Sequence, residues 1–162
     1  MKILIKNARI IIENKILEGY SIIIEKGVIT QIIEDKQIGV TAGLTTVDGR
    51  GQYLAPGFID IHNHGNSGFD AMDADEKALK VMSEFHLNRG VTGFLATTMT
   101  NSHENTVNVI KNAVACAEKN ICKDARLIGL YLEGPYFCME KKGAQPAKNI
   151  RAINLKELQK FI

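Results

Sequence analysis

The sequence has few cysteines and none of the patterns that usually give cysteine a structural role. There are three in 162 residues, an odd number, and none of them forms a CxxC pair. This count argues against a disulfide framework. We therefore expect reduced thiols in a cytoplasmic protein.

Long apolar runs and basic clusters are also missing. No stretch reaches the roughly 18 uninterrupted apolar residues of a membrane span. The first segment, MKILIKNARIIIENK, is charged throughout, so we expect neither a signal peptide nor a membrane partner. The net charge is +2, and no basic run is interleaved with aromatic residues. The sequence therefore gives no reason to expect a nucleic-acid partner.

Residues 1–54 predict a small sheet of short strands. The stretches KILIKNARIII and YSIIIEKGVITQIIED are rich in isoleucine, whose β-branched side chain favours strands. The short segments ENK, EGY and EKG that punctuate them suit tight turns. Residues 41–53 concentrate glycine, threonine and aspartate, and we expect them to form a connecting loop.

From residue 55 onward, predicted strands alternate with predicted helices. Apolar runs and helical periodicity give strand 54–61, helix 73–90, strand 91–100, helix 102–119, strand 125–135 and a helix from about 154. Asp73 and Glu76 resemble a helix-start box for the first of these helices. The strands recur about every 35 residues, which is typical of a parallel sheet with crossover helices.

This order favours a (β/α)8 barrel over a Rossmann fold, because no GxGxxG motif follows the first strand. A closed barrel needs about 250 residues, so the chain is too short for one. We predict an α/β protein with two domains. Residues 55–162 form an incomplete TIM-type (β/α)8 barrel of about three βα units, and residues 1–54 form a separate β segment. Functional residues of such barrels lie at the carboxyl ends of the strands.

Two of the four histidines lie at such a position, in the segment APGFIDIHNHG. Side chains alternate along a strand, so we expect His62 and His64 to project to one side while Asn63 points away. Two imidazoles on one face can bind a single metal ion. The alternative is a pair of exposed histidines in a loop, which would have the same pattern.

Glu133 ends the third predicted strand, in the segment YLEGPYF. A carboxylate there can bind one divalent cation or bridge two, although a solvated glutamate at a strand end is an alternative. The first and third strands of a barrel deliver their last residues to the same mouth. Together with His62 and His64, Glu133 therefore has the composition of a catalytic divalent-metal site.

Two further segments each leave two interpretations open. The hydroxyl run TTMT, residues 97–100, either lines the mouth or satisfies the carbonyl groups at the strand end. The segment KKGAQP, residues 141–146, either recognises a polar or anionic substrate or is a plain surface loop.

Four segments together resemble a known enzyme family. APGFIDIHNHG, GVTGFLATTMT, GLYLEGPYF and KKGAQP occur here in the order found in the N-acetylglucosamine-6-phosphate deacetylases of the amidohydrolase superfamily. The first segment is shared across the superfamily, whereas LEGP followed by KKGAQP is particular to these deacetylases. The resemblance covers essentially the whole chain. It implies that residues 1–54 belong to a small β-sandwich that a distant part of the enzyme completes.

The resemblance implies that the enzyme removes acetate from N-acetylglucosamine 6-phosphate to give glucosamine 6-phosphate. Its cofactor would be a divalent metal, such as zinc, iron, manganese or cobalt, with one or two ions per site. Glu133 matches the family's metal-binding glutamate, and His62 and His64 match a pair that binds a second metal in some members. Ala144 and Gln145 match positions that contact the sugar. Family members are commonly homodimers.

The family's catalytic aspartate and two more of its metal-binding histidines lie on later strands. We therefore assign no catalytic residue here, expect the general base beyond residue 162, and expect this chain alone to be inactive. One alternative is another amidohydrolase-superfamily enzyme, such as a dihydroorotase-like or dipeptidase-like hydrolase, which would share HxH but not LEGP with KKGAQP. The other is a non-catalytic metal-binding or assembly fragment.

Overall fold

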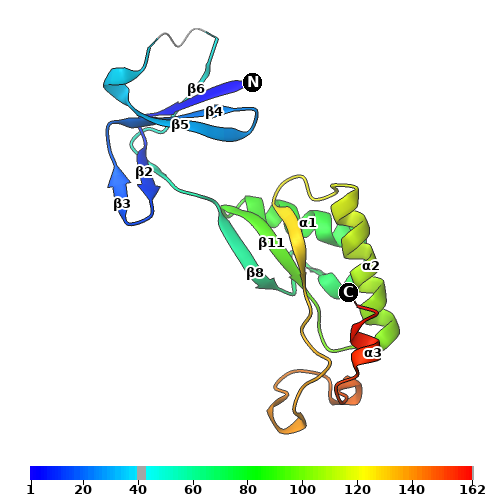
Figure 1. Ribbon diagram of the computed structural model, residues 1–162. Helices are drawn as coiled ribbons and strands as arrows, with labels where there is room; N and C mark the ends of the chain where they lie inside the picture. Colours follow the sequence, from blue (N-terminus) through cyan, green and yellow to red (C-terminus); the bar gives the residue numbers. More distant parts are fainter. Residues whose placement is uncertain (40–42, 162) are drawn as a thin grey trace. The chain divides into compact units, whose positions relative to one another are not determined.

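The computed structural model describes residues 1–39 and 43–161, and these form two compact units, Met1–Pro56 and Gly57–Ile162 (Figure 1). Both units contain β-sheet, and the helices that pack on a sheet belong to the second, so the chain is of mixed α/β type. Each unit has its own core of buried apolar residues. No helix in the described part of the chain is both long and apolar enough to cross a bilayer.

The first unit contains two small sheets. One has the strand order β5-β4-β1-β6, and the other has the order β3-β2-β7. Their bounds are β1 Lys2–Lys6, β2 Arg9–Ile12, β3 Lys15–Leu17, β4 Tyr20–Glu25, β5 Val28–Glu34, β6 Thr45–Asp48 and β7 Tyr53–Leu54, with a 3-10 turn η1 at Asp35–Gln37. Ile10 of β2 and Ile22 of β4 lie in one buried cluster, so both sheets contribute to the core.

The connecting loop expected over residues 41–53 is only partly correct. Residues 41 and 42 lie outside the described part of the chain. Strand β6 pairs in parallel with β1, and β7 pairs in parallel with β2. Threonine and valine at 45–47 favour a strand, and backbone pairing with β1 satisfies their amide groups. The glycine-rich composition of the surrounding segment hid these short strands.

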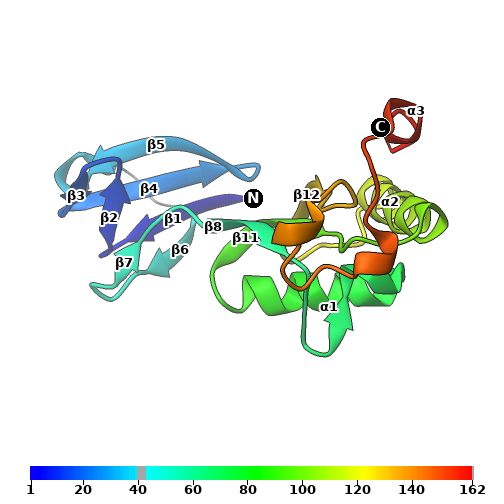
Figure 2. The same cartoon turned by 90° about the horizontal axis from the view of Figure 1, so that it is seen from below.

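The second unit is built on a parallel three-stranded sheet of order β12-β11-β8 (Figures 1 and 2). Its strands are β8 Phe58–Asn63, β11 Val91–Thr97 and β12 Arg126–Tyr131, and a hairpin of β9 Gly65–Asn66 and β10 Phe69–Asp70 follows β8. The helices are α1 Glu76–Leu87, α2 His103–Glu118 and α3 Leu155–Leu158, with 3-10 turns η2 Ala71–Asp73, η3 Met139–Lys141 and η4 Ala147–Asn149.

One core joins both long helices to the sheet. It contains Met82 of α1, Cys116 of α2, Phe94 of β11 and Leu127 of β12, all buried. The predicted alternation of strands and helices is therefore observed. Strands β11 and β12 end three and four residues before their predicted ends at 100 and 135, and β8 continues two residues beyond its predicted end at 61. Burial of apolar side chains at helical and strand spacing stabilises this layer.

The start of α1 differs from the prediction. The N-cap is Asp75, whose carboxylate accepts a hydrogen bond from the backbone N–H of Lys77 at 3.1 Å. Asp73 instead accepts from the backbone N–H of Asp70 at 2.8 Å and closes a capping box around η2. Both turns need a carboxylate cap, and the sequence alone did not show that there are two turns.

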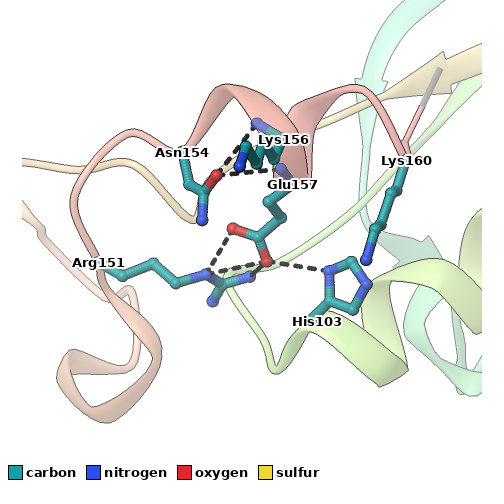
Figure 3. A pocket seen from close by; sticks show the side chains of 6 residues that line it. All are labelled: His103, Arg151, Asn154, Lys156, Glu157 and Lys160. Carbon is teal, nitrogen blue, oxygen red and sulfur yellow. Dashed lines mark hydrogen bonds and ion pairs between the residues drawn. The ribbon is translucent and has the colours of Figure 1, made fainter.

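The segment around α3 is held by Glu157 (Figure 3). Its carboxylate accepts hydrogen bonds from Arg151 and from the hydroxyl of Tyr136, and lies 3.0 Å from Nδ1 of His103 at the start of α2. These partners, Arg151 first, lower the pKa of Glu157 to about 2. His103 therefore helps to anchor the end of the chain.

Candidate metal centre

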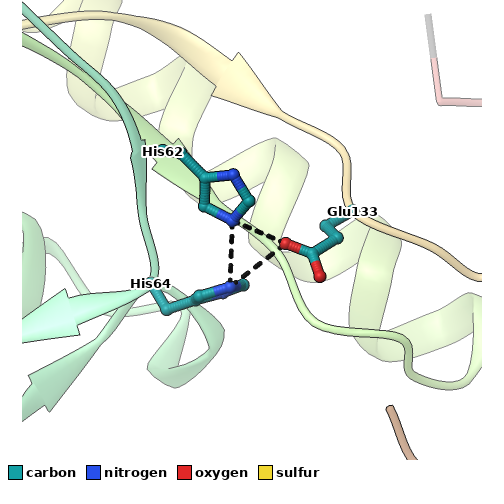
Figure 4. Close-up of side chains that lie close together, drawn as sticks. All are labelled: His62, His64 and Glu133. Atoms are coloured by element: carbon teal, nitrogen blue, oxygen red, sulfur yellow. Dashed lines mark hydrogen bonds and ion pairs between the residues drawn. The ribbon is translucent and has the colours of Figure 1, made fainter. Parts of the chain in front are cut away.

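Three side chains converge at the carboxyl ends of the outer strands of the sheet (Figure 4). His62 lies near the end of β8, His64 follows it, and Glu133 lies two residues after β12. Nε2 of His62 is 2.7 Å and Nε2 of His64 is 3.2 Å from Oε2 of Glu133. The two Nε2 atoms are 3.3 Å apart. The structure thus brings together the three residues for which the sequence suggested metal binding.

The spacing of these atoms fits a shared cation. Ligands bound about 2.0–2.1 Å from a tetrahedral ion lie about 3.3 Å from one another. Two of the observed separations, 3.2 and 3.3 Å, match that value, and the third, 2.7 Å between His62 and Glu133, is shorter. Oε2 of Glu133 is buried, and the two imidazole nitrogens approach it at 2.7 and 3.2 Å. A buried carboxylate is costly unless a donor or a cation compensates its charge, and a cation held by all three side chains would do so.

The two histidines point to the same place, with their Nε2 atoms 3.3 Å apart, although the strand that carries His62 is irregular. Asp60 pairs with Phe94 and Asn63 pairs with Ala96, so β8 carries one residue more than β11 over this interval. His64 lies beyond the last residue of β8. The extra residue thus lies between Asp60 and Asn63, in the part of β8 that contains His62.

Gly65 follows His64 for a steric reason. Its backbone is not in the left-handed region, so conformational freedom is not the reason for glycine here. A Cβ at this position would lie 2.1 Å from the carbonyl oxygen of Phe69 in the paired strand β10. The absence of a side chain therefore permits close approach of two backbones.

Gln145 is buried and its side chain contacts Glu133. Its amide Nε2 donates a hydrogen bond to Oε1 of Glu133, and its Oε1 accepts one from the backbone N–H of Thr100 at 2.9 Å. Ala144, the other residue matched to sugar contacts, is exposed. The hydrogen bond from Gln145 to the carboxylate of Glu133 is not predicted by the sequence pattern.

The hydroxyl run after β11 was also left open by the sequence. Thr97 and Thr98 are fully buried, and their hydroxyls accept hydrogen bonds from the backbone N–H groups of Asn63 and Glu133. Neither interpretation describes these bonds fully, because the hydroxyls bind mainly backbone N–H groups of the neighbouring strand ends; the carbonyl oxygen of Glu133 lies 3.4 Å from the hydroxyl of Thr98.

His86 belongs to the core. It is buried on α1, with its ring centroid 4.7 Å from that of Phe94. Burial lowers its pKa, and the negative charge of Asp60 partly opposes this effect. These contacts make it a packing residue of the second unit.

A comparison with known families accounts for this arrangement. The sequence profile described as "Amidohydrolase family" matches residues 53–161. The chain belongs to the amidohydrolase family. The match includes all of the second unit's sheet and the three converging side chains of the candidate metal centre.

Similar members of this family include known deacetylases. An N-acetylglucosamine-6-phosphate deacetylase of Bacillus subtilis is 34% identical over 98% of this chain and 40% of its own length. An N-acetylgalactosamine-6-phosphate deacetylase of Escherichia coli O157:H7 is 31% identical over 95% of this chain and 39% of its own length. These findings confirm the resemblance inferred from the sequence.

A solved structure agrees with the fold of this family member. The crystal structure of an N-acetylglucosamine-6-phosphate deacetylase from Pasteurella multocida matches with a TM-score of 0.89 and 28% identity. The match covers 98% of this chain and 41% of that one. The chain therefore spans about two fifths of the length of these relatives.

Proposed function

We propose that the chain is part of a metal-dependent deacetylase that converts N-acetylglucosamine 6-phosphate to glucosamine 6-phosphate and acetate. The observation that carries this proposal is the convergence of His62, His64 and Oε2 of Glu133 in an amidohydrolase similar to such deacetylases. Lone histidine pairs are common, but a buried carboxylate oxygen that approaches both imidazole nitrogens supports a shared cation at this point.

His62, His64 and Glu133 would hold the divalent ion, which zinc suits well because imidazole nitrogen and carboxylate oxygen are both zinc ligands. Iron, manganese and cobalt take the same ligand types, and a complete site would hold one or two ions. When bound, such an ion polarises a carbonyl oxygen and lowers the pKa of water. Glu133 contributes by keeping one oxygen aimed at the histidines while Gln145 holds the other.

The loop over residues 141–146 is proposed to contact the amino sugar, through exposed Ala144 and through Gln145. The ammonium group of Lys142 donates hydrogen bonds to the backbone oxygens of Gly143 and Gln145, both at 3.1 Å. These bonds brace the loop beside Glu133. The similarity to an N-acetylgalactosamine-6-phosphate deacetylase makes its substrate the second candidate.

The finer architecture follows the same proposal. Residues 55–162 would be about three βα units of an incomplete TIM-type (β/α)8 barrel, and residues 1–54 would be part of a small β-sandwich. Support comes from the parallel order of β8, β11 and β12, in which consecutive strands are neighbours. We also propose a cytoplasmic homodimer.

No residue of this chain is proposed as the general base. The relatives are more than twice as long as this chain, so we propose that the proton-transferring carboxylate and further metal ligands come from a region outside these 162 residues. The chain alone should then bind metal and sugar without releasing acetate.

Ligand-observed NMR tests this function. With zinc present, saturation transfer from the chain to the acetyl methyl of N-acetylglucosamine 6-phosphate is expected, and glucose 6-phosphate should compete weakly because it lacks the acetamide. Glu133→Gln should reduce the transfer. The proposed substrate would be contradicted if glucose 6-phosphate competed as well as unlabelled N-acetylglucosamine 6-phosphate does, and if Glu133→Gln gave the same transfer as the wild type. A parallel titration with N-acetylgalactosamine 6-phosphate ranks the second candidate.

A further inference from the structure

The central strand of the three-stranded sheet in the second unit supplies none of the three proposed ligands, yet its end contacts both segments that do. Strand β11 lies between β8, which carries His62, and β12, which leads to Glu133. Its last residue, Thr97, and the next one, Thr98, have no exposed surface. Buried hydroxyls are costly unless they are hydrogen-bonded, so their partners matter.

Each hydroxyl bonds to one ligand-bearing segment. Oγ1 of Thr97 accepts from the backbone N–H of Asn63 at 2.9 Å. Oγ1 of Thr98 accepts from the backbone N–H of Glu133 at 3.0 Å. Asn63 is the residue between the two histidines, and Glu133 is the carboxylate itself.

These contacts occur where the regular strand pairing stops. The last pair between β11 and β8 is Ala96 with Asn63, and the last between β11 and β12 is Thr97 with Tyr131. Beyond these points the backbones of neighbouring strands are free to separate. The hydroxyl of Thr97 reinforces the last pair with β8 at Asn63, and the hydroxyl of Thr98 continues the attachment past the last pair with β12, to Glu133.

Thr98 is also fixed by two further contacts. The hydroxyl of Thr98 lies 3.4 Å from the carbonyl oxygen of Glu133, to which it donates. The backbone N–H of Thr98 donates to the carbonyl oxygen of Tyr131 at 3.0 Å. Thr98 therefore grips Glu133 at its N–H and at its carbonyl oxygen, so the residue's backbone has little freedom to rotate.

We propose that Thr97 and Thr98 are positioning residues that set the distance between the histidine pair and Glu133. The inference rests on the proposed metal-dependent function. Thr97 and Thr98 are adjacent at the end of β11, so the backbone geometry sets the distance between their two hydroxyls. Because one hydroxyl binds the backbone at Asn63 and the other binds the backbone at Glu133, this distance also sets the spacing between the histidine pair and Glu133. Partners that orient metal ligands typically change metal affinity about 10–100-fold when removed.

The test uses valine and serine variants at both positions in the whole 162-residue chain. Valine keeps the β-branched shape but removes the hydroxyl, whereas serine keeps the hydroxyl. Thr106→Val is the matched control, because Thr106 is also buried and its hydroxyl donates to a backbone oxygen, that of Ser102, at 2.9 Å. Zinc affinity is measured by competition with a chelator, the visible spectrum of bound cobalt reports ligand geometry, and urea unfolding reports stability.

Thr97→Val and Thr98→Val should each weaken zinc binding about 10–100-fold and change the cobalt spectrum, and the serine variants should restore both. Thr106→Val should lose stability and keep the affinity and spectrum of the wild type. Folded valine variants with unchanged affinity and spectrum would overturn the positioning role and leave the metal site intact. A wild-type chain that takes no metal, or takes it equally well as Glu133→Gln, would overturn the proposed function and this inference together.

Discussion

Gln145 donates a hydrogen bond from its side-chain amide to Oε1 of Glu133, and Oε2 of the same carboxylate faces His62 and His64. A flip of the amide group would break both hydrogen bonds, because its oxygen accepts a hydrogen bond from the backbone N–H of Thr100. One carboxylate oxygen is thus occupied by a neutral donor, and the other is left for a cation. This division of roles is a common way to orient a metal ligand.

Replacing Gln145 by Met should therefore weaken metal binding while keeping the side-chain volume. The variant removes the donor to Glu133 and leaves the buried N–H of Thr100 without its acceptor. We expect an affinity for zinc reduced about 10–100-fold and a free energy of unfolding reduced by about 1–3 kcal/mol. Chelator competition and urea unfolding measure the two effects. Wild-type zinc affinity in a destabilised variant would show that the amide serves the loop alone.

Gly65→Ala tests the close approach behind His64. The added Cβ would meet the carbonyl oxygen of Phe69 at 2.1 Å, so the β9–β10 hairpin must shift. We expect a loss of stability of about 1–3 kcal/mol, as for overpacked sites, together with weaker zinc binding. Thermal unfolding with and without zinc measures both.

The control for this variant is Gly39→Ala. An added Cβ at Gly39 meets no atom within 4 Å among the described residues. Its effect should stay within about 0.5 kcal/mol of the wild type. Equal effects of the two substitutions would show that crowding at Gly65 is not the cause.

The sequence predicted the alternation of strands and helices because their apolar spacing is regular and their side chains are buried on one face. It also identified His62, His64 and Glu133 as neighbours, since ends of parallel strands meet at one edge. It could not show the extra residue in β8, because a bulge leaves no distinct pattern in residue types. It could not show that Gln145 contacts Glu133, because loop contacts depend on packing that periodicity does not encode.

Glu157 should make the free energy of unfolding depend on pH in the acidic range. Its partners lower its pKa from 4.5 to about 2, so the stabilisation is complete above about pH 4.5 and is lost as the pH falls toward 2. Hydrogen bonds to charged groups contribute about 1.5–3 kcal/mol. Glu157→Gln should therefore reduce the free energy of unfolding near pH 7 and have little effect near pH 2.

Urea unfolding of the wild type and Glu157→Gln at a series of pH values checks this dependence. Arg151→Met removes the first of the partners and should give a similar profile, because Arg151 is the main cause of the lowered pKa. A difference between wild type and Glu157→Gln that is constant with pH would contradict an ionic role.

The three free cysteines should differ in reactivity. Cys138 is exposed, whereas Cys116 and Cys122 are buried. Burial raises the pKa of Cys122 to about 11 and also raises that of Cys116, so both remain protonated at neutral pH. A thiol reagent near pH 8 should modify one thiol per native chain rapidly and the other two only on unfolding. Cys138→Ser should abolish the rapid phase, and rapid reaction of several thiols in the native chain would show that the core is open.

Zinc binding to the purified chain, with its stoichiometry measured by elemental analysis and its affinity by chelator competition, most directly tests whether His62, His64 and Glu133 form a metal centre. The wild type should bind at least one ion per chain. Glu133→Gln and His62→Ala should each lose at least the 10–100-fold in affinity that removal of an outer partner costs, while Glu104→Gln, at an exposed position on α2, should bind as the wild type does. Equal binding by all four proteins, or no binding by any of them, would contradict a metal centre at these residues.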